Sequence, residues 1–276
     1  VDRLRQAASA QDVCPVCREP LPPGPAKLYD EAVTKHVRVK RQVERVGVGW
    51  SNLPRELQRE MDEVRELYEQ AADQGLAVAQ FNLGHMYHEG KEVAQDWTKA
   101  REWWELAAAQ GDAGAQNNLG NMYREGKGVA QDWTKAREWY ELAAAQGYVQ
   151  AQYNLGVLYD QGLGVAQDFT KAREWWELSA AQGNAKAMAN IGVMYLCGQG
   201  VEQDLNEAMR WLLKAKAHAL DVSRQMECVM ELRKRQNAVT RDKDSWTSTR
   251  CGGGGDGAGE SSRAERSERQ SGATHP

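Results

Sequence analysis

Two cysteines near the N-terminus are the residues whose type and spacing most directly suggest a chemical role. Cys14 and Cys17 are separated by two residues, and at this spacing two thiolates can bind one tetrahedral zinc ion. A structural zinc site requires four ligands, however, and residues 1–13 contain no Cys or His. The pair therefore represents half of a zinc site or two free thiols.

His85, His88 and Glu89 form a second group of potential ligands. Their order differs from the H-E-x-x-H pattern that places two zinc ligands on one helix face, so two solvated histidines are favoured over a metal site. The sequence also contains no nucleophile–base spacing, phosphate-binding loop or pair of catalytic carboxylates. We therefore expect no enzymatic activity and no cofactor in the chain as given, and zinc only if the missing ligands lie upstream of Val1.

A block of 36 residues that occurs four times dominates the rest of the sequence. The copies span residues 76–111, 112–147, 148–183 and 184–219, and the first two match at 29 of 36 positions. Such a repeat is typical of a solenoid, in which each unit packs against its neighbours. The repetition therefore predicts the scaffold that must position any binding residues.

The first half of each copy has the pattern of a helix, here called helix A. In the second copy, Ala115, Leu119 and Met122 recur at helical spacing and place apolar side chains on one face. Gly126 and Gly128 then interrupt the pattern. Helix A is therefore expected to end in a glycine-containing loop.

The second half predicts another helix, here called helix B. Asp132 stands at its N-cap, where a carboxylate accepts hydrogen bonds from free backbone N–H groups. Ala136 and Ala143 follow on one face, and Gly147 ends the helix because glycine tolerates a left-handed conformation. Each copy is therefore expected to form two antiparallel helices.

A glycine lies in the middle of every helix A. Glycine costs about 1 kcal/mol relative to alanine in a helix, so we expect close packing against a ring from helix B to compensate. The glycines are Gly84, Gly120, Gly156 and Gly192. The rings expected to contact them are Trp103, Trp139, Trp175 and Trp211.

The G-x-G-V-x-Q-D loop, the A-x-x-W step of helix B and the closing A-A-x-Q-G resemble the Sel-1-like repeat. This repeat is a relative of the tetratricopeptide repeat, which has a shorter period of 34 residues and a proline near its end. The resemblance covers residues 76–219, with Glu92 in place of the second loop glycine in the first copy. It implies an all-α fold, a right-handed alpha-alpha superhelix.

A second resemblance lies at the N-terminus, where C-P-V-C-R and E-P-L-P are similar to the closing ligand pair and exit segment of a RING zinc finger. It implies that Cys14 and Cys17 bind zinc and that Pro15 and Arg18 contact a ubiquitin-conjugating enzyme. Six ligands of a complete RING are absent. We expect the chain to be a fragment, since Val1 is not an initiator Met, and a degenerate finger with free thiols is the alternative.

The segments around the repeats complete the expected domain organisation. Residues 1–26 are assigned to the RING remnant, and residues 27–53 to a linker with a basic helix. Residues 54–75 and 220–236 are expected to form capping helices, because the ends of a solenoid need covering. Residues 237–276, rich in Arg, Ser, Gly and acidic residues, are expected to form a disordered tail.

Composition excludes several classes of partner. The formal net charge is −4, so no overall basic field favours nucleic acid. No run of about 20 apolar residues predicts a membrane span. Five cysteines without the spacing of a disulfide framework favour a reducing compartment, and we expect a cytoplasmic or nuclear protein.

Comparison of the four copies separates constant from variable positions in helix A. Positions 78, 81, 85 and 88 and their equivalents vary between copies and lie on one helix face, here called the variable stripe. The resemblance to tetratricopeptide-like solenoids implies that the A helices line a groove for a peptide or protein, although exposed positions can also vary without function. The candidate partner-binding residues are Phe81, His85, His88, Asn117, Asn121, Arg124, Tyr153, Val157 and Asp160.

Two functions are compatible with these features. The first is a protein-interaction scaffold that binds a protein or peptide along the groove of the A helices. The alternative is the substrate-binding part of a RING-type ubiquitin ligase whose zinc finger is truncated in this chain. Cysteines and histidines at RING spacing upstream of Val1 would favour the ligase.

Overall fold

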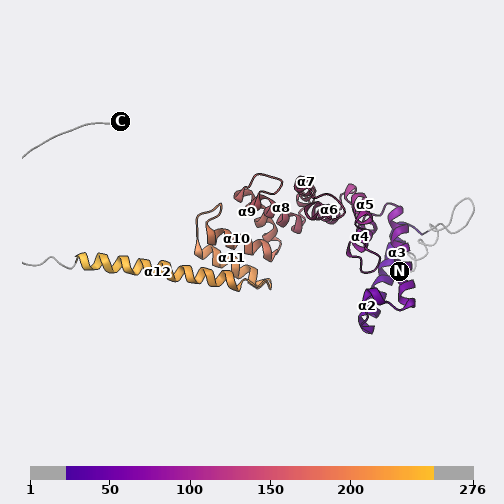
Figure 1. Ribbon diagram of the computed structural model, residues 1–276, viewed down its shortest axis with the longest axis horizontal. Coiled ribbons are helices and arrows are strands. Elements are labelled where there is room, and N and C mark those ends of the chain that lie inside the picture. The colour runs from indigo at the N-terminus through magenta and orange to yellow at the C-terminus, as the bar shows by residue number, and fades with distance from the viewer. Residues whose placement is uncertain (1–22, 252–276) are drawn as a thin grey trace, which may run out of the picture. The chain divides into compact units, whose positions relative to one another are not determined.

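The structure is a computed structural model that describes residues 23–251. The chain divides into two compact units, Val1–Val229 and Met230–Pro276. The described part of the first unit contains helices α2 to α11 and the beginning of α12 (Figure 1). Residues 1–22 and 252–276, which include the zinc-finger segment, lie outside the described residues.

Every regular element between residues 23 and 251 is helical, which confirms the all-α prediction. Helices α4 to α11 form four antiparallel pairs in the first unit, and each pair corresponds to one predicted repeat with its A and B helices. The bounds are α2 Pro25–Val46, a 3-10 turn Trp50–Asn52, α3 Arg55–Asp73, α4 Ala77–Glu89, α5 Trp97–Ala109, α6 Ala113–Glu125, α7 Trp133–Ala145, α8 Val149–Gln161, α9 Phe169–Ala181, α10 Ala185–Cys197, α11 Leu205–Ala217 and α12 Ser223–Cys251.

The predicted helix ends are confirmed by their local geometry. The Asp132 carboxylate caps α7 by accepting a hydrogen bond from the Lys135 backbone N–H at 3.0 Å. After the same helix, Gly147 adopts a φ of +82°, in the left-handed region that favours glycine. The sequence therefore encodes both ends of helix B with single residues.

The close packing at the glycines of helix A is present, but the expected rings are displaced by one residue. A Cβ atom on Gly84 would lie 2.4 Å from the Trp104 ring, and one on Gly156 would lie 2.3 Å from the Trp176 ring. The residues that contact the four glycines are Trp104, Tyr140, Trp176 and Leu212, not Trp103, Trp139, Trp175 and Trp211. Adjacent positions on a helix differ by about 100° in direction, so only the second residue of each pair faces helix A.

Paired glutamines link consecutive repeats. The Gln116 side chain accepts a hydrogen bond from Gln146 Nε2 at 2.8 Å within its own repeat, and it donates to the Ala108 carbonyl of the preceding repeat at 3.3 Å. The pairs Gln80–Gln110 and Gln152–Gln182 repeat the contact between side chains. In the fourth repeat Met188 and His218 occupy these positions, so both glutamines are replaced together.

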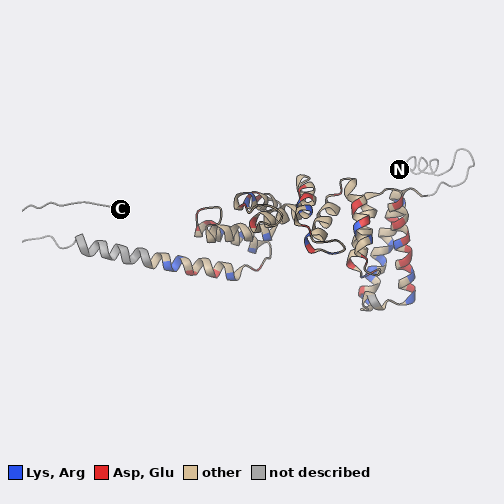
Figure 2. Ribbon diagram, turned by 45° about the horizontal axis from the view of Figure 1, so that its top comes forward, with Lys and Arg blue, Asp and Glu red and all other residues tan. Residues whose placement is uncertain are grey.

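The basic helix expected within residues 27–53 corresponds to α2, and the structure adds that this helix is packed against α3. Helix α2 forms an antiparallel pair with α3 and buries Leu28, Ala32, Val39 and Val43. Its basic side chains face acidic residues of α3, as the mixed colours on these two helices show (Figure 2). The amphipathic spacing of those four apolar residues is the physical reason, because an isolated linker has no partner against which to bury them.

Two ion pairs connect basic side chains of α2 to acidic side chains of α3. Lys35 Nζ lies 3.1 Å from the Glu63 carboxylate, and Arg38 lies 2.8 Å from Glu60. These exposed pairs fit a solvated helix face. The N-terminal cap of the array is therefore a helical hairpin that includes α3, and not α3 alone.

Helix α12 covers the predicted C-terminal capping segment and extends beyond it. Val222, just before the helix, and Val229 within it are buried, at 1% and 0% exposed. The helix continues to Cys251, so residues 237–251 of the predicted tail are helical in the structure. Residues 237–251 contain no Gly or Pro to stop the helix, and the rest of the predicted tail lies outside the described residues.

Candidate partner-binding groove

The variable stripe lies on the A helices α4, α6, α8 and α10, and parts of it line pockets between neighbouring repeats. Two of these pockets carry most of the predicted residues. His85, His88 and Asn121 line a pocket of about 320 Å³ between the first and second repeats, here called the first groove pocket. Tyr153, Val157 and Asp160 line a pocket of about 280 Å³ between the third and fourth repeats, here called the second groove pocket.

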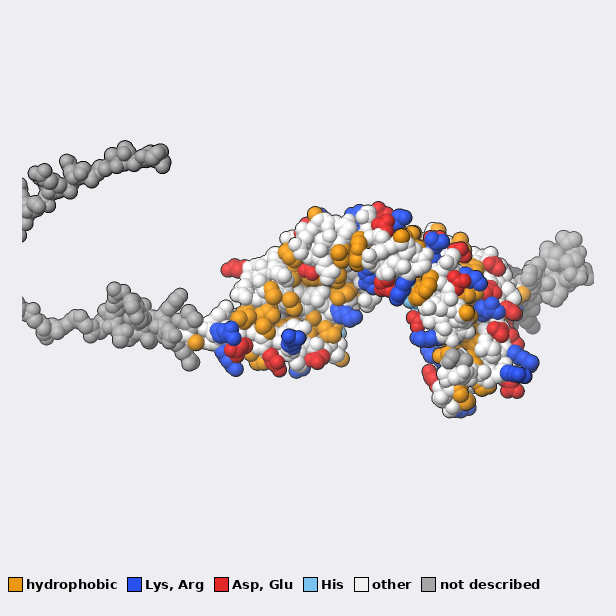
Figure 3. All heavy atoms as spheres, in the orientation of Figure 1, with side chains coloured by type: hydrophobic (Ala, Val, Ile, Leu, Met, Phe, Trp, Pro, Cys, Tyr) orange, Lys and Arg blue, Asp and Glu red, His pale blue; other side chains and the backbone are white. Residues whose placement is uncertain are grey.

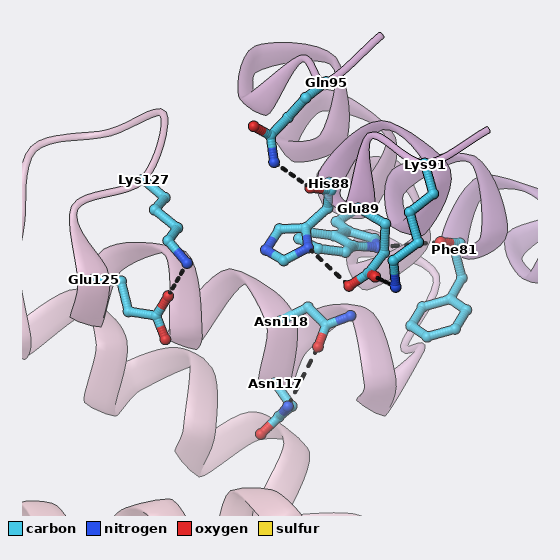
Figure 4. A network of polar contacts seen from close by, with 10 residues as sticks. Phe81, His88, Glu89, Lys91, Gln95, Asn117, Asn118, Glu125 and Lys127 are labelled. Carbon is cyan, nitrogen blue, oxygen red and sulfur yellow. Dashed lines mark hydrogen bonds and ion pairs between the residues drawn. The ribbon is translucent and has the colours of Figure 1, made fainter. Parts of the chain in front are cut away.

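His88 forms one wall of the first groove pocket and packs against two indole rings. Its ring centroid lies 4.8 Å from that of Trp97 and 5.2 Å from that of Trp104. Burial lowers the pKa of His88 below its usual value, although the nearby Glu89 carboxylate opposes this shift (Figure 4). His88 is therefore held by packing as well as presented to the pocket.

Charged residues of both signs surround the same pocket. Lys127 Nζ lies 2.7 Å from the Glu125 carboxylate, and Lys91 Nζ lies 2.5 Å from Glu89. The hydrogen bond from Lys91 lowers the pKa of Glu89. Burial raises the pKa of Glu125, but hydrogen bonds from Lys127 and Arg124 outweigh it and lower the pKa overall. Both carboxylates are therefore ionised at neutral pH, so the pocket is strongly polar.

The second groove pocket has a more apolar lining. Val157 of α8 and Val193 of α10 line it, together with Trp176 of α9. The Trp176 indole N–H donates to the Tyr153 carbonyl at 3.1 Å, which fixes the ring. Asp160 is half-buried there, and burial raises the pKa of its carboxyl group. The two pockets therefore occupy equivalent places in the array but present different chemistry.

Several of the nine predicted residues also take part in contacts within the protein, among them Asn117, Phe81 and Arg124. Asn117 is 4% exposed and accepts a hydrogen bond from Asn154 Nδ2 at 3.1 Å, so this position is buried and not on an open face. Phe81 is half-buried, and its ring would lie 2.9 Å from a Cβ atom on Gly114 in the next helix A. Arg124 pairs with the adjacent Glu125. Contacts between repeats thus restrict Asn117 and Phe81, and an ion pair within α6 restricts Arg124.

Sequence reasoning missed a third pocket, at the N-terminal end of the array. This N-terminal pocket of about 300 Å³ is lined by His36 and Lys40 of α2 and by Tyr68, Asn82 and Glu92. Glu92 Oε1 lies 2.8 Å from His36 Nε2, so the residue that replaces a loop glycine contacts α2. The only sequence signal for this pocket was Glu92, which departs from the repeat pattern. Its partner His36 lies 56 positions away in the sequence, so the contact was not visible from local spacing.

Within residues 23–251, no group of three or more His, Cys, Asp or Glu side chains has the arrangement of a metal site. This range includes His85, His88 and Glu89. The predicted zinc ligands Cys14 and Cys17, and the predicted contact residues Pro15 and Arg18, lie outside the described residues. None of the helices in the described range is long and apolar enough to cross a membrane.

Comparison with solved structures finds similar repeat proteins. A Sel1 repeat protein from Oxalobacter formigenes is 29% identical, with a TM-score of 0.59 over 79% of this chain and 83% of that one. The protective antigen c5321 of uropathogenic Escherichia coli is 32% identical, with a TM-score of 0.57 over 71% of this chain. This chain spans only 41% of the length of c5321. No curated protein matches the sequence.

The sequence pattern of the Sel1 repeat matches residues 65–76, 77–112, 113–148, 149–184 and 185–219. These segments cover more than half of the chain, begin within one residue of the four predicted copies and add the end of α3. Sel1 repeat proteins generally act as protein-interaction scaffolds. The chain therefore belongs to the Sel1 repeat family.

Proposed function

We propose that this protein is a scaffold that binds a protein or peptide segment along the groove of its A helices. The observation that carries the proposal is the convergence of stripe residues in pockets between neighbouring repeats. Residues that vary between copies line these pockets, while the core residues behind them recur. A constant frame with a variable lining suits recognition of one specific partner.

Surface charge supports a partner recognised by local contacts and not by a long-range field. Charged side chains of both signs lie among hydrophobic ones on the face shown in Figure 3. The net charge of −4 likewise provides no basic field for nucleic acid. Cys197 and Cys228 are free and exposed, which fits the proposed cytoplasmic or nuclear location, a reducing environment.

The test compares two double variants of the whole chain in a pull-down of bound protein. His85→Glu with Val157→Arg alters both groove pockets. Leu142→Arg with Leu178→Arg makes changes of similar size on helices α7 and α9, where these leucines are 51% and 50% exposed. We expect only the groove variant to lose a partner retained by the wild type. Equal retention by the two folded variants would exclude the groove.

The second candidate is a ubiquitin ligase, and the C-P-V-C-R segment supports it. In this proposal the repeats hold a substrate while Cys14 and Cys17 contribute to a zinc site that recruits the conjugating enzyme. The test is zinc content of the protein expressed with its natural upstream sequence. We expect the wild-type protein to bind one zinc ion through Cys14 and Cys17, and the Cys14→Ser variant to lose that ion. If the wild-type protein binds no zinc, the ligase proposal is excluded and the scaffold proposal remains.

A further inference from the structure

The N-terminal pocket has the same frame as the two groove pockets, one repeat period earlier in the chain. Tyr68 lines it at the position that Trp104 takes in the first groove pocket and Trp176 takes in the second. Met86 likewise corresponds to Met122, which lies 36 positions later and lines the first groove pocket. The frame of the groove pockets therefore extends to the helical hairpin of α2 and α3.

One wall of the N-terminal pocket comes from α2, which is not a copy of the repeat. This helix has 22 residues, whereas each helix A has 13. It contributes His36, Val37 and Lys40 to the pocket. The pocket therefore combines the frame of the repeat with side chains that the repeat does not supply.

His85 of α4 separates the N-terminal pocket from the first groove pocket. Its side chain is exposed and lines both pockets. No other side chain is needed to connect them, because the two pockets adjoin at this residue. A segment that fills the first groove pocket can therefore place a nearby residue in the N-terminal pocket.

Several polar groups of the N-terminal pocket are already bonded within the protein. Glu92 Oε1 accepts a hydrogen bond of 2.8 Å from His36 Nε2, since a carboxylate only accepts. The Tyr68 hydroxyl lies 3.4 Å from Nδ1 of the same imidazole ring. Asn82 donates to the Tyr29 hydroxyl at 3.1 Å. The negative charge of Glu92 is therefore directed at His36, and these contacts fix the wall of the pocket.

Lys40 differs from these groups in being uncommitted. Its side chain is exposed, and among residues 23–251 its ammonium group has neither a hydrogen bond nor an ion pair. Lys35 and Arg38 of the same helix are instead paired with carboxylates of α3. Val37, which is 42% exposed, and Met86 add apolar surface to the pocket. The pocket therefore offers a positive charge without a partner and an apolar wall.

We propose, on the basis of the groove function above, that the groove continues onto α2 and that the N-terminal pocket binds an acidic side chain of the partner segment through Lys40. The carboxylate of Asp or Glu accepts hydrogen bonds from the Lys40 ammonium group. The methylene groups of the acidic side chain contact Val37 and Met86. The contact between His36 and Glu92 holds α2 against the first repeat and so keeps Lys40 in place.

The first experiment is a charge reversal. Linear peptides are selected from a random displayed library on the immobilised wild-type chain and, separately, on Lys40→Glu. We expect the wild-type peptides to share an Asp or Glu, and the peptides selected on Lys40→Glu to carry Lys or Arg at that position. Arg41→Glu is the matched control, because it makes the same change of charge one position away on an exposed residue outside the pocket. This control should still select the acidic residue.

The second experiment measures the contact with one selected peptide and its amide analogue, in which the shared acid is replaced by Asn or Gln. The dissociation constants of both peptides are measured with the wild type and with Lys40→Gln. We expect the amide analogue to bind the wild type about three- to tenfold more weakly, and Lys40→Gln to bind the two peptides equally. The difference seen with the wild type should shrink at high salt. The melting temperature of Lys40→Gln should equal that of the wild type, because the Lys40 side chain is exposed.

Other results would overturn the inference. If Lys40→Gln keeps the preference for the acidic peptide while Val157→Arg weakens binding, the groove function stands and the role of Lys40 is wrong. Loss of the acidic preference in Arg41→Glu as well would indicate a general charge effect and exclude a specific contact. If free glutarate binds the wild type but not Lys40→Gln, and the selected peptides share no acid, the pocket binds small anions and is not part of the groove. If Val157→Arg weakens neither the peptides nor the natural partner, the proposed groove itself is wrong.

Discussion

At the scale of single residues, the rotation of helix B determines which of two adjacent aromatic side chains is buried in the core. Tyr140 is fully buried against Gly120, and its hydroxyl donates to Asn121 Oδ1 at 2.7 Å, whereas Trp139 is only half-buried. We expect Tyr140→Ala to lower the free energy of unfolding by roughly 3–5 kcal/mol, and Trp139→Ala by less. Chemical denaturation measures both, and a larger loss in Trp139→Ala would contradict this register. Tyr140→Phe, which removes only the hydroxyl, should cost about 1 kcal/mol.

His88 provides a second prediction at this scale, through the dependence of stability on pH. Its pKa in the folded protein is lower than its usual 6.5 because of burial, so the unfolded chain binds a proton more readily. Stability is therefore lost as pH falls through about 6.5 towards the folded-state pKa. We expect His88→Gln to lose less stability than the wild type between pH 7.5 and 5, measured by urea unfolding. Parallel losses in the two proteins would show that His88 protonation does not oppose folding.

At the scale of helices, the closeness of A and B helices depends on a missing side chain. A Cβ atom at Gly156 would meet the Trp176 ring at 2.3 Å, and this ring is fixed by its hydrogen bond to Tyr153. We expect Gly156→Ala to be destabilising by about 1–3 kcal/mol, even though alanine favours helices. Thermal unfolding tests this. Gly192→Ala is the control, because its Cβ would meet the more flexible Leu212 side chain at 3.0 Å. If Gly192→Ala loses as much stability as Gly156→Ala, the ring contact is excluded as the cause.

At the scale of the first unit, the α2 helix completes the array as a cap. Val39 of α2 is fully buried, whereas Val37 is 42% exposed on the same helix. We expect Val39→Asp to detach α2 from α3, lower stability on the order of 3 kcal/mol and increase binding of a hydrophobic dye. Val37→Asp should change neither. Similar stability of the two variants would show that α2 is not needed to cover the array.

The sequence alone determined the repeat architecture of this protein. Its 36-residue period, the aspartate caps and the terminal glycines such as Gly147 act locally, and each fixes a helix end through the backbone of its own segment. The stripe on helix A also followed from periodicity, and the structure brings three of its residues together in the first groove pocket and four in the second. Local rules are visible in sequence because they depend on neighbours within a few positions.

Only the tertiary structure decided which side chains are free to act. The choice of Tyr140 over Trp139, the burial of Asn117 and the contact of Glu92 with His36 depend on residues from other helices. A single sequence does not specify such contacts, because helix rotation by one residue leaves the pattern of apolar positions almost unchanged. Packing between the helices fixes that rotation, and with it the side chains that line the groove.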